Sequence, residues 1–348
     1  MEEKKKKVLL IKLSSLGDVI CNIPFANALK SAGYYVTWIV SEKGFQVIKN
    51  NPCVDKAILA PVEKWKKAGL CLNNFKEYLS ILKQIRAENF DYAIDTQMLL
   101  KSMYWLIFSG AKTRVSSIEG REFSYLGANK ILGKISIPDL PIAKKYMRFG
   151  KFLGINEDEI KVTLPARSPE QIQKIDNLLS NIDKNKPLVV IAPATTWENK
   201  HWNKDYWKEV VSELTPQCNI VFTGGPCDNE LIQYISHPDN MNLAGKTDLL
   251  ELAELFSRAD LVMSPDSGSA HLAWATQKPA LITIFTCTPP ESLAPYGNPD
   301  KYVALGGKGL PCQTCFKRKC ILKENINACT NIPTPQEVLN TVKHLIFS

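Results

Sequence analysis

Val8-Leu9-Leu10-Ile11-Lys12-Leu13, followed at once by the turn Ser14-Ser15-Leu16-Gly17-Asp18, is the stretch of sequence that decides the fold. The run has no polar alternation before Lys12, which is typical of a central parallel strand covered on both faces. Apolar residues of helical period follow from 19 to 29, up to a Ser-Ala-Gly stop signal. A second apolar run covers residues 35–40. These segments predict a strand–helix–strand unit and therefore a doubly wound α/β sheet.

The 348 residues are enough for two domains, and the second half repeats the same pattern. Prolines surround a polar segment at residues 160–186, where we place the joint. The prediction is two Rossmann-like domains, residues 1–165 and 166–348, with ligands bound in a cleft at the carboxyl ends of the strands. Further strands are expected at 57–59, 92–95, 188–192, 219–223, 261–263 and 280–285, and helices at 75–87, 102–108, 206–214, 249–258 and 270–276.

A polar loop, Asp266-Ser267-Gly268-Ser269-Ala270-His271, separates a predicted strand from a predicted helix. Gly268 lets the backbone approach a ligand closely, and the hydroxyl of Ser267 lies beside a helix N-terminus, which attracts phosphate. We therefore expect Asp266, Ser267, Gly268 and His271 to line a diphosphate. The alternative is that Asp266 or Ser267 only caps the helix and that His271 packs in the core.

Two more polar loops follow predicted strands in the second half. Thr195 and Thr196, with Lys200 nearby, offer two hydroxyls and a cation, an arrangement that suits phosphate. Gly224-Gly225 permits close approach by a ribose or base, and Asp228 could bind sugar hydroxyls. The alternatives are a capped helix start with a surface lysine and an ordinary glycine turn.

In the first half, the turn after the opening strand contains Asp18, which could act as a general base and deprotonate an acceptor hydroxyl. The alternative is that Asp18 is only the N-cap of the following helix.

In order and spacing, over nearly the whole chain, these clusters resemble glycosyltransferase family 9, the lipopolysaccharide heptosyltransferases. Within the family the chain looks most like the first heptosyltransferase, on the residues around Lys64, Asp95 and Thr195. The matching motifs are the opening strand with Ser14-Ser15-Leu16-Gly17-Asp18, Asp95-Thr96-Gln97 with Lys101, Thr195-Thr196 with Lys200-His201-Trp202, Gly224-Gly225-Pro226, and Asp266-Ser267-Gly268 with His271.

The resemblance implies a GT-B fold, an ADP-heptose donor in the C-terminal domain and inversion at the anomeric carbon. By position, Asp18 would be the base and Lys200 would neutralise the leaving diphosphate, with Thr195, Thr196, Ser267, Gly268 and His271 also lining it. The acidic ribose contact falls near Asp228. No metal cofactor is expected, because such folds use protein cations and helix ends and the chain has no Asp-x-Asp motif. The family often has Thr at position 267, and Ser267 keeps the hydroxyl.

The net charge of +8 lies in the first half, where 26 basic residues face 16 acidic ones, which suggests an anionic partner. The resemblance makes this partner Kdo-lipid A, held by Lys64, Lys66, Lys67, Gln97, Lys101 and Arg121, and implies a cytoplasmic enzyme on the inner face of the inner membrane, without nucleic acid. The alternative is a lysine-rich solvated face, including residues 64–67.

Cys312, Cys315, Cys320 and Cys329 form a C-x2-C-x4-C-x8-C pattern in the loop 310–330. The spacing permits a structural zinc site, reduced buried thiols or a disulfide, none of which would run the reaction.

Three further functions stay open from the sequence alone. A second heptosyltransferase type would transfer onto a core heptose. A sugar-nucleotide epimerase or hydrolase on the same fold would consume donor without acceptor. A non-enzymatic nucleic-acid or zinc-binding module is disfavoured by polar clusters at strand ends in both halves.

Overall fold

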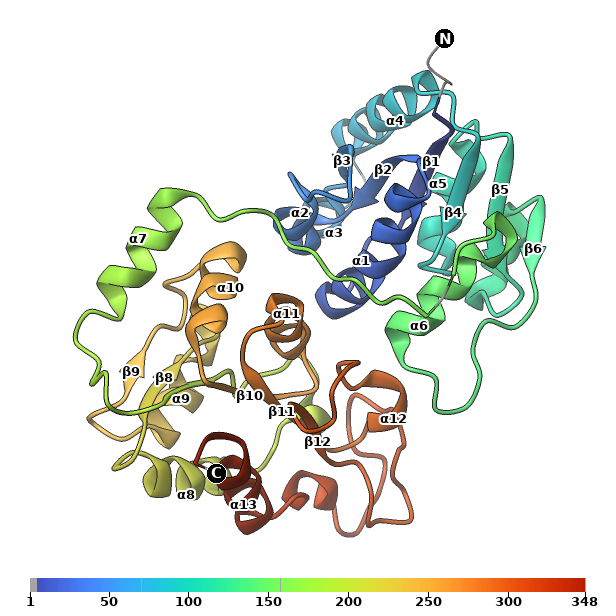
Figure 1. The fold of residues 1–348 in the computed structure, drawn as a ribbon. Helices are drawn as coiled ribbons and strands as arrows, with labels where there is room; N and C mark the ends of the chain where they lie inside the picture. The colour runs from blue at the N-terminus through green and yellow to red at the C-terminus, as the bar shows by residue number, and fades with distance from the viewer. Residues whose placement is uncertain (1–4, 70, 157, 348) are drawn as a thin grey trace. The chain divides into compact units, whose positions relative to one another are not determined.

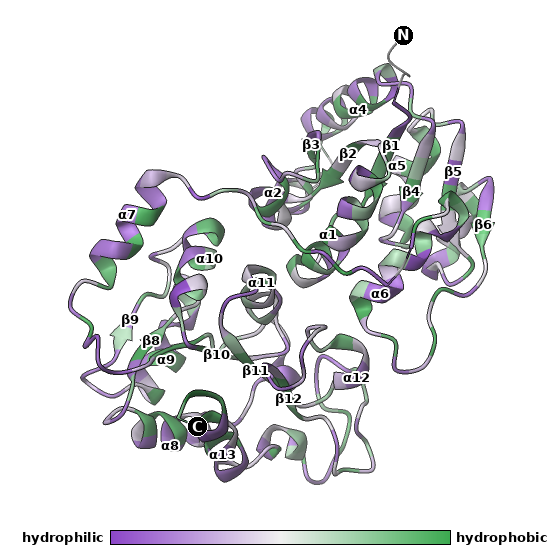
Figure 2. Cartoon of the chain, viewed as in Figure 1, coloured by the Kyte–Doolittle hydropathy of each residue, from purple (hydrophilic) through white to green (hydrophobic). Residues whose placement is uncertain are grey.

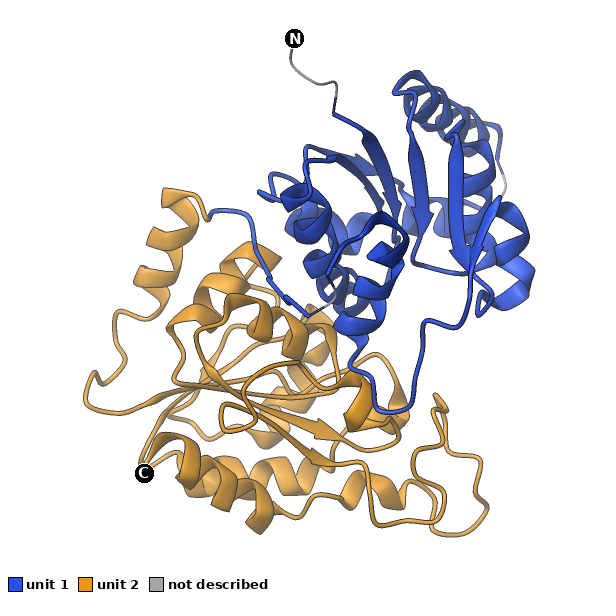
Figure 3. Cartoon of the chain, turned by 45° about the vertical axis from the view of Figure 1, so that its right-hand side comes forward, with its two compact units in different colours: residues 1–166 blue, residues 167–348 orange. Residues whose placement is uncertain are grey.

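The computed structural model describes residues 5–69, 71–156 and 158–347, and the chain divides into two compact units, Met1–Ala166 and Arg167–Ser348 (Figures 1 and 3). The sequence placed the joint one residue earlier. The chain crosses from the first unit to the second only once, so each unit is one continuous stretch. None of the helices in the described ranges is long and apolar enough to cross a bilayer.

Unit 1 contains a six-stranded parallel sheet in the order β3-β2-β1-β4-β5-β6. The buried central strand β1 carries the apolar run that opens the chain, as predicted for a strand covered on both faces. The strands are β1 (Lys7–Ile11), β2 (Tyr35–Val40), β3 (Lys56–Leu59), β4 (Tyr92–Asp95), β5 (Thr113–Ser117) and β6 (Lys130–Leu132).

Helices cover both faces of this sheet. Leu9 and Ile11 of β1 point to a core shared with α3, α4 and α5, and alternation along the strand turns Val8, Leu10 and Lys12 to the opposite face, where α1 packs against α6 (Figure 1). The helices of unit 1 are α1 (Leu16–Ser31), α2 (Glu42–Ile48), α3 (Val62–Ala68), α4 (Leu72–Ala87), α5 (Leu100–Phe108), η1 (Arg121–Gly127), α6 (Ile142–Met147) and η2 (Arg148–Leu153).

Unit 2 repeats this architecture with the parallel order β12-β11-β10-β7-β8-β9. Its strands are β7 (Leu188–Ile191), β8 (Asn219–Phe222), β9 (Met241–Asn242), β10 (Leu261–Pro265), β11 (Ala280–Phe285) and β12 (Tyr302–Gly306). Its helices are α7 (Pro169–Leu178), η3 (Glu198–Lys200), α8 (Lys204–Leu214), η4 (Pro226–Asp228), α9 (Asn229–Ile235), α10 (Leu249–Arg258), α11 (Gly268–Thr276), α12 (Pro290–Leu293), η5 (Ala328–Asn331) and α13 (Pro335–Ile346).

Each sheet reverses its strand order once, between β1 and β4 in unit 1 and between β7 and β10 in unit 2. In open parallel sheets the loops at the carboxyl ends of such strand pairs flank a crevice that binds ligands. The predicted loops 14–18 and 95–97 follow β1 and β4, and the predicted loops 194–202 and 266–271 follow β7 and β10. The α/β prediction is confirmed, and it places four polar clusters at the two reversal points.

Candidate functional sites

The unit 1 site is built around Asp18 in the first turn of α1. Ser15 is the N-cap of this helix, and its N–H and hydroxyl donate to Asp18 Oδ2 at 3.1 and 2.8 Å. Asp18 is therefore the third helical residue and not the cap, which corrects the alternative considered from the sequence. Its side chain stays 35% exposed, so the carboxylate can reach a ligand.

Two buried side chains that sequence reasoning missed hold the other oxygen of Asp18. The Tyr146 hydroxyl donates to Oδ1 at 2.6 Å, and the same hydroxyl accepts from Lys12 Nζ at 2.7 Å. The ammonium of Lys12 also lies 3.5 Å from Oδ1, and its side chain is only 4% exposed. Lys12 and Tyr146 thus fix the carboxylate from the protein interior.

Opposing effects act on the pKa of Asp18. Burial alone would raise it, but the Lys12 ammonium and the hydrogen bonds from Tyr146 and Ser15 outweigh burial and hold the pKa well below its usual range. Burial, and after it the Asp18 carboxylate, raises the pKa of Tyr146 well above its usual value. At neutral pH the site therefore presents an ionised carboxylate and a neutral phenol.

Gln97 braces this loop, and Asp95 in turn holds Gln97. The Gln97 side-chain oxygen accepts from the backbone N–H groups of Leu13 and Ser14 at 3.1 and 2.9 Å. Asp95 accepts from the N–H groups of Gln97 and Met98 and, at 2.9 Å, from the hydroxyl of Ser102. Burial raises the pKa of Asp95 to about 6, against these hydrogen bonds. Gln97, predicted to contact the acceptor, has its oxygen engaged by the loop.

Basic side chains surround Asp18 at the same edge of the sheet. Lys101 Nζ donates to Ser14 Oγ at 2.9 Å, and its pKa is lowered by burial and then by neighbouring Lys66. Burial lowers the pKa of Lys145, a residue that the sequence did not single out, whereas the nearby carboxylates of Glu119 and Asp18 act to raise it. Of the other predicted acceptor residues, Lys66, Lys67 and Arg121 are exposed, while Lys64 pairs with Glu77 at 3.0 Å.

The unit 2 site joins two of the predicted loops through one ion pair. Lys200 Nζ lies 2.6 Å from Asp266 Oδ2, and the same oxygen accepts from the Thr288 hydroxyl at 2.7 Å. The Asp266 side chain is 6% exposed and that of Lys200 is 15% exposed. Asp266 was predicted to line the diphosphate, and in this structure its carboxylate contacts Lys200 and Thr288.

The N-terminus of α11 completes this wall. Ser267 is the N-cap: its hydroxyl accepts from the Ser269 N–H at 3.2 Å and shares a hydrogen bond with Ser264. Gly268 is the first helical residue, and His271 is buried within the helix. The capping alternative is correct for Ser267, and a helix N-terminus of this kind also attracts an anion through its backbone N–H groups.

A hollow of about 270 Å³ lies beside this helix, at the ends of β7 and β8. Gly224 and Asp228 lie in its wall, where Asp228 Oδ2 accepts from the Gly225 N–H at 2.7 Å; a Cβ at position 224 would lie 2.7 Å from the same oxygen. Thr195 lies half-buried nearby in sequence and Thr196 is exposed. The lining residues are Ala192, Ala194, Thr223, Gly224, Gly225, Asp228, Thr247, Asp248, Leu249, Leu252 and Ser269.

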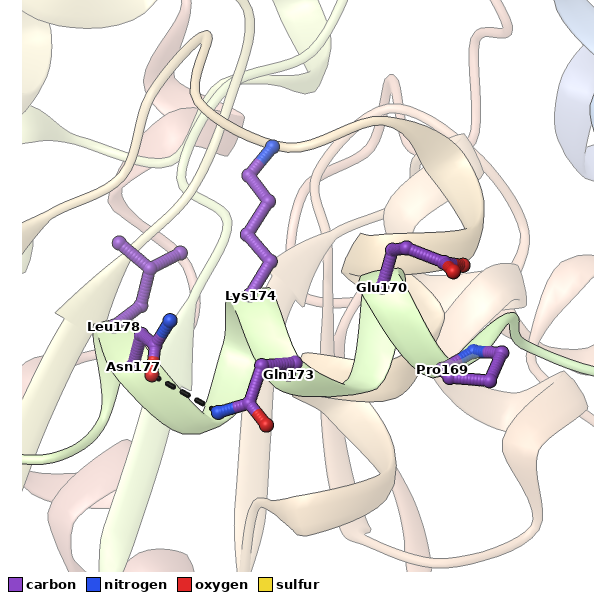
Figure 4. A pocket seen from close by; sticks show the side chains of 6 residues that line it. All are labelled: Pro169, Glu170, Gln173, Lys174, Asn177 and Leu178. Atoms are coloured by element: carbon purple, nitrogen blue, oxygen red, sulfur yellow. Dashed lines mark hydrogen bonds between the residues drawn. The ribbon is translucent and has the colours of Figure 1, made fainter.

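A larger hollow, about 630 Å³, runs along α7 and is less suited to chemistry. Figure 4 shows that all its lining side chains come from this one helix, and that Gln173 hydrogen-bonds Asn177 along it. Lys174 is engaged by Glu251 at 2.7 Å. Because these groups do not converge on a point, we place the ligand site at the strand ends.

The cysteine-rich loop forms no metal site in this structure. Among the residues in the described ranges, no three His, Cys, Asp or Glu side chains are close enough to hold a metal ion, and the cysteines are free thiols. Cys329 is buried, and burial followed by the neighbouring cysteines raises its pKa to about 11.

Comparison with known proteins adds an independent result. The family model described as glycosyltransferase family 9 (heptosyltransferase) matches residues 78–326. The chain is 29% identical over 316 residues to the lipopolysaccharide core heptosyltransferase OpsX of Haemophilus influenzae, covering 87% of this chain and 85% of that protein. It is 25% identical over 332 residues to lipopolysaccharide heptosyltransferase 1 of Pseudomonas aeruginosa, covering 90% and 87%.

A solved structure shares the fold of the whole chain. The structure of E. coli heptosyltransferase WaaC with ADP-2-deoxy-2-fluoro heptose superposes with a TM-score of 0.72 at 22% identity, covering 97% of this chain and 99% of that one. The two-sheet architecture is therefore that of a known group of transferases.

Proposed function

This chain belongs to glycosyltransferase family 9 (heptosyltransferase) and is a glycosyltransferase of GT-B fold; from that premise we propose that it moves a heptose from ADP-heptose to the Kdo sugar of the lipopolysaccharide inner core. Relatives named lipopolysaccharide heptosyltransferases support the sugar and the pathway. The E. coli WaaC structure with an ADP-heptose analogue supports the donor.

One observation carries the assignment of roles to the two units. At the strand reversal of unit 1 a partly exposed carboxylate, Asp18, is held by a buried lysine, whereas at that of unit 2 a buried carboxylate holds the more exposed Lys200. Glycosyl transfer needs both features, because a base must receive the acceptor proton and a cation must stabilise the leaving diphosphate.

The reaction then proceeds as one displacement. The acceptor hydroxyl oxygen attacks the anomeric carbon of the heptose, and the bond from that carbon to the β-phosphate oxygen breaks with both electrons leaving on ADP. The hydroxyl proton passes to Asp18. Because the pKa of Asp18 is low, the proton transfers late, when the attacking oxygen has already become acidic by bonding to carbon. Attack opposite to the leaving group inverts the anomeric configuration.

Protein groups supply the leaving-group stabilisation in this proposal. The Lys200 ammonium and the N–H groups at the start of α11 attract the diphosphate, and Ser267, Thr195 and Thr196 add hydroxyl donors. His271 supports α11 from its buried position, and Asp228 contacts the ribose. Because these cations do the work usually given to a metal, chelation by EDTA should leave the rate unchanged.

The acceptor is proposed to be Kdo-lipid A on the cytoplasmic face of the inner membrane. Its carboxylates and phosphates match the basic groups of unit 1, of which Lys101 and Lys145 lie close enough to Asp18 to interact with it electrostatically. The other proposed acceptor cations are Lys64, Lys66, Lys67 and Arg121. Gln97 acts by holding the Ser14 loop in place.

The decisive experiment measures ADP release by the purified protein from ADP-heptose, with and without Kdo-lipid A. We expect release only when the acceptor is present, with a heptose-bearing product in mass spectrometry. Release at full rate without acceptor would identify an epimerase or hydrolase. Transfer only onto an acceptor that already carries a heptose would identify the second heptosyltransferase type.

A further inference from the structure

An unusual amount of apolar side chain is exposed on one layer of unit 1. Three neighbouring elements, α4, α5 and η1, carry it, and we call it the α4–α5–η1 face. It consists of Leu72, Phe75, Leu79, Leu100, Tyr104, Ile107, Phe108, Phe123 and Leu126, each 38–69% exposed. Exposed apolar residues are normal when scattered, but a group of this size marks a binding surface.

On each helix the exposed apolar residues follow helical spacing. Leu72, Phe75 and Leu79 of α4 lie at i, i+3 and i+7, and residues 100, 104, 107 and 108 of α5 lie at i, i+4, i+7 and i+8. On α5 the core side chains Trp105 and Leu106 lie on the opposite side of the helix from these residues, whereas on α4 the exposed residues adjoin the core side chains Leu82 and Ile85. Both helices therefore carry apolar side chains that the fold leaves uncovered, and Figure 2 shows hydrophobic and hydrophilic segments mixed along α4.

Aromatic and backbone contacts hold these elements together as one surface. Tyr78 of α4 packs edge-on against Trp105 of α5, with 4.7 Å between the ring centroids. Burial raises the pKa of Tyr78, and the exposed Tyr104 of α5 lies close enough to raise it further. The N–H of Leu100 donates to Glu122 of η1 at 2.9 Å. A Cβ added at Gly127 would lie 2.6 Å from Met103, so η1 packs directly on α5.

The surroundings of this face are basic. Lys76 and Lys83 are exposed on the same side of α4 as its apolar stripe. Lys66 and Lys67 are exposed on α3, and α3 lies beside α5 because the ring of Trp65 stacks on that of Trp105, with 6.3 Å between the ring centroids. Arg121 is exposed at the start of η1. The acidic residues Glu77 and Glu122 are engaged by Lys64 and by the Leu100 N–H. Apolar stripes with a lysine border are typical of surfaces that lie on anionic membranes.

We propose that the α4–α5–η1 face docks the enzyme on the surface of an anionic lipid bilayer. This inference rests on the proposed function, because an acceptor that is linked to lipid requires the enzyme to work at a membrane. The predicted acceptor cations Lys66, Lys67, Lys101 and Arg121 come from α3, α5 and η1, so the acceptor headgroup would meet them beside the bilayer. A second copy of the chain fits less well, because a two-fold interface would bring the same lysines against each other.

The test is co-sedimentation of the full chain with vesicles of phosphatidylethanolamine and phosphatidylglycerol, with phosphatidylcholine vesicles for comparison. In the variant Phe75→Ser/Leu79→Ser we expect binding to anionic vesicles to fall about tenfold or more, because two inserted side chains are lost. Ile107→Ser/Phe108→Ser should behave alike. The matched control is Ile321→Ser/Ile326→Ser in unit 2, whose side chains are 67% and 62% exposed and which should bind as the unchanged protein does.

A second variant and two further readouts separate the explanations. Lys76→Gln/Lys83→Gln should reduce the preference for anionic over neutral vesicles. All variants should transfer heptose normally to a Kdo acceptor that carries no lipid, with unchanged melting temperature. Equal vesicle binding by Phe75→Ser/Leu79→Ser and the unchanged protein would overturn the inference. It would also be overturned if light scattering showed that the unchanged protein is a dimer and that this variant is a monomer. If vesicle binding behaves as expected but no heptose is transferred, the proposed function fails and the docking face stands.

Discussion

The two strand reversals of this molecule use the same pair of residue types with opposite burial. In unit 1 the lysine, Lys12, is 4% exposed and Asp18 is 35% exposed; in unit 2 Asp266 is 6% exposed and Lys200 is 15% exposed. In each pair a hydrogen bond offsets the desolvation of the buried member: Lys12 donates to Tyr146, and Asp266 accepts from Thr288. One lysine–aspartate pair can therefore present an anion or a cation, depending on which partner the core holds.

The largest effect on activity is expected at Asp18, the more exposed member of the pair in unit 1. Asp18→Asn keeps the size and one hydrogen-bond acceptor but removes the base, so kcat should fall by about 10³-fold or more. The Kd for ADP-heptose should stay unchanged, because the donor site lies in unit 2 in the proposal. Steady-state kinetics with Kdo-lipid A and donor titration measure the two quantities. Transfer at an unaltered rate would remove Asp18 as base.

The second largest effect on activity is expected at Lys200, the more exposed member of the pair in unit 2. Lys200→Gln should lower kcat by about 10²-fold, since one preorganised charge at the leaving diphosphate is lost. It should also lower the melting temperature, because Asp266 is left buried without its partner.

Two variants sharpen this result. Lys200→Gln/Asp266→Asn should recover stability but not activity, and Lys278→Gln, which changes an exposed lysine of the same unit, should alter neither. If the double variant regained the rate, Lys200 would have only a structural role.

A smaller effect is expected at the hydrogen bond that orients the base. Tyr146→Phe removes the hydroxyl that stabilises ionised Asp18, so the pKa of Asp18 should rise and kcat should drop by about tenfold. The acidic limb of the kcat–pH profile should move to higher pH, because protonated Asp18 cannot accept the acceptor proton. A lower rate with an unmoved acidic limb would show that Tyr146 acts on packing alone.

The smallest effect on activity is expected at Asp95, where the expected change is in how stability depends on pH. Its pKa is raised by burial to about 6, above the ordinary 3.8, so the folded state binds more protons between these values and stability should fall as pH rises through this window. The full loss is about 3 kcal/mol or less at 1.4 kcal/mol per pH unit. Asp95→Asn should flatten this dependence in urea unfolding followed from pH 4 to 7. A profile that stays as steep would assign the dependence to other groups.

Much of this arrangement follows from the sequence, for a physical reason. Buried parallel strands need continuous apolar runs, and their carboxyl ends must carry the polar loops, so strands such as 35–40 and 280–285 were predicted with their observed bounds. Short edge strands such as β6 and β9 were missed, because three and two residues carry no periodic signal. The predicted helix 270–276 begins two residues earlier, at Gly268, since Ser267 is the cap.

The partners of the site residues were harder to predict. Lys12 interrupts an apolar run and gave no sign that it pairs with a carboxylate six residues later, and Tyr146 reaches Asp18 from α6, far along the chain. Such contacts depend on how a helix packs over the sheet, which local pattern does not determine. A lysine inside an otherwise buried strand is nevertheless a usable signal, because a buried ammonium requires an anion or several acceptors.

The single passage of the chain from one unit to the other has a practical consequence. The last helix, α13, packs through Val338, Leu339 and Val342 into the core of unit 2, so neither unit borrows an element from the other end of the sequence. The gene can therefore be divided at one codon boundary, between positions 166 and 167, into one fragment for each unit. Donor affinity could then be screened on a 182-residue fragment, and chimaeras that exchange one half could show which half selects the sugar.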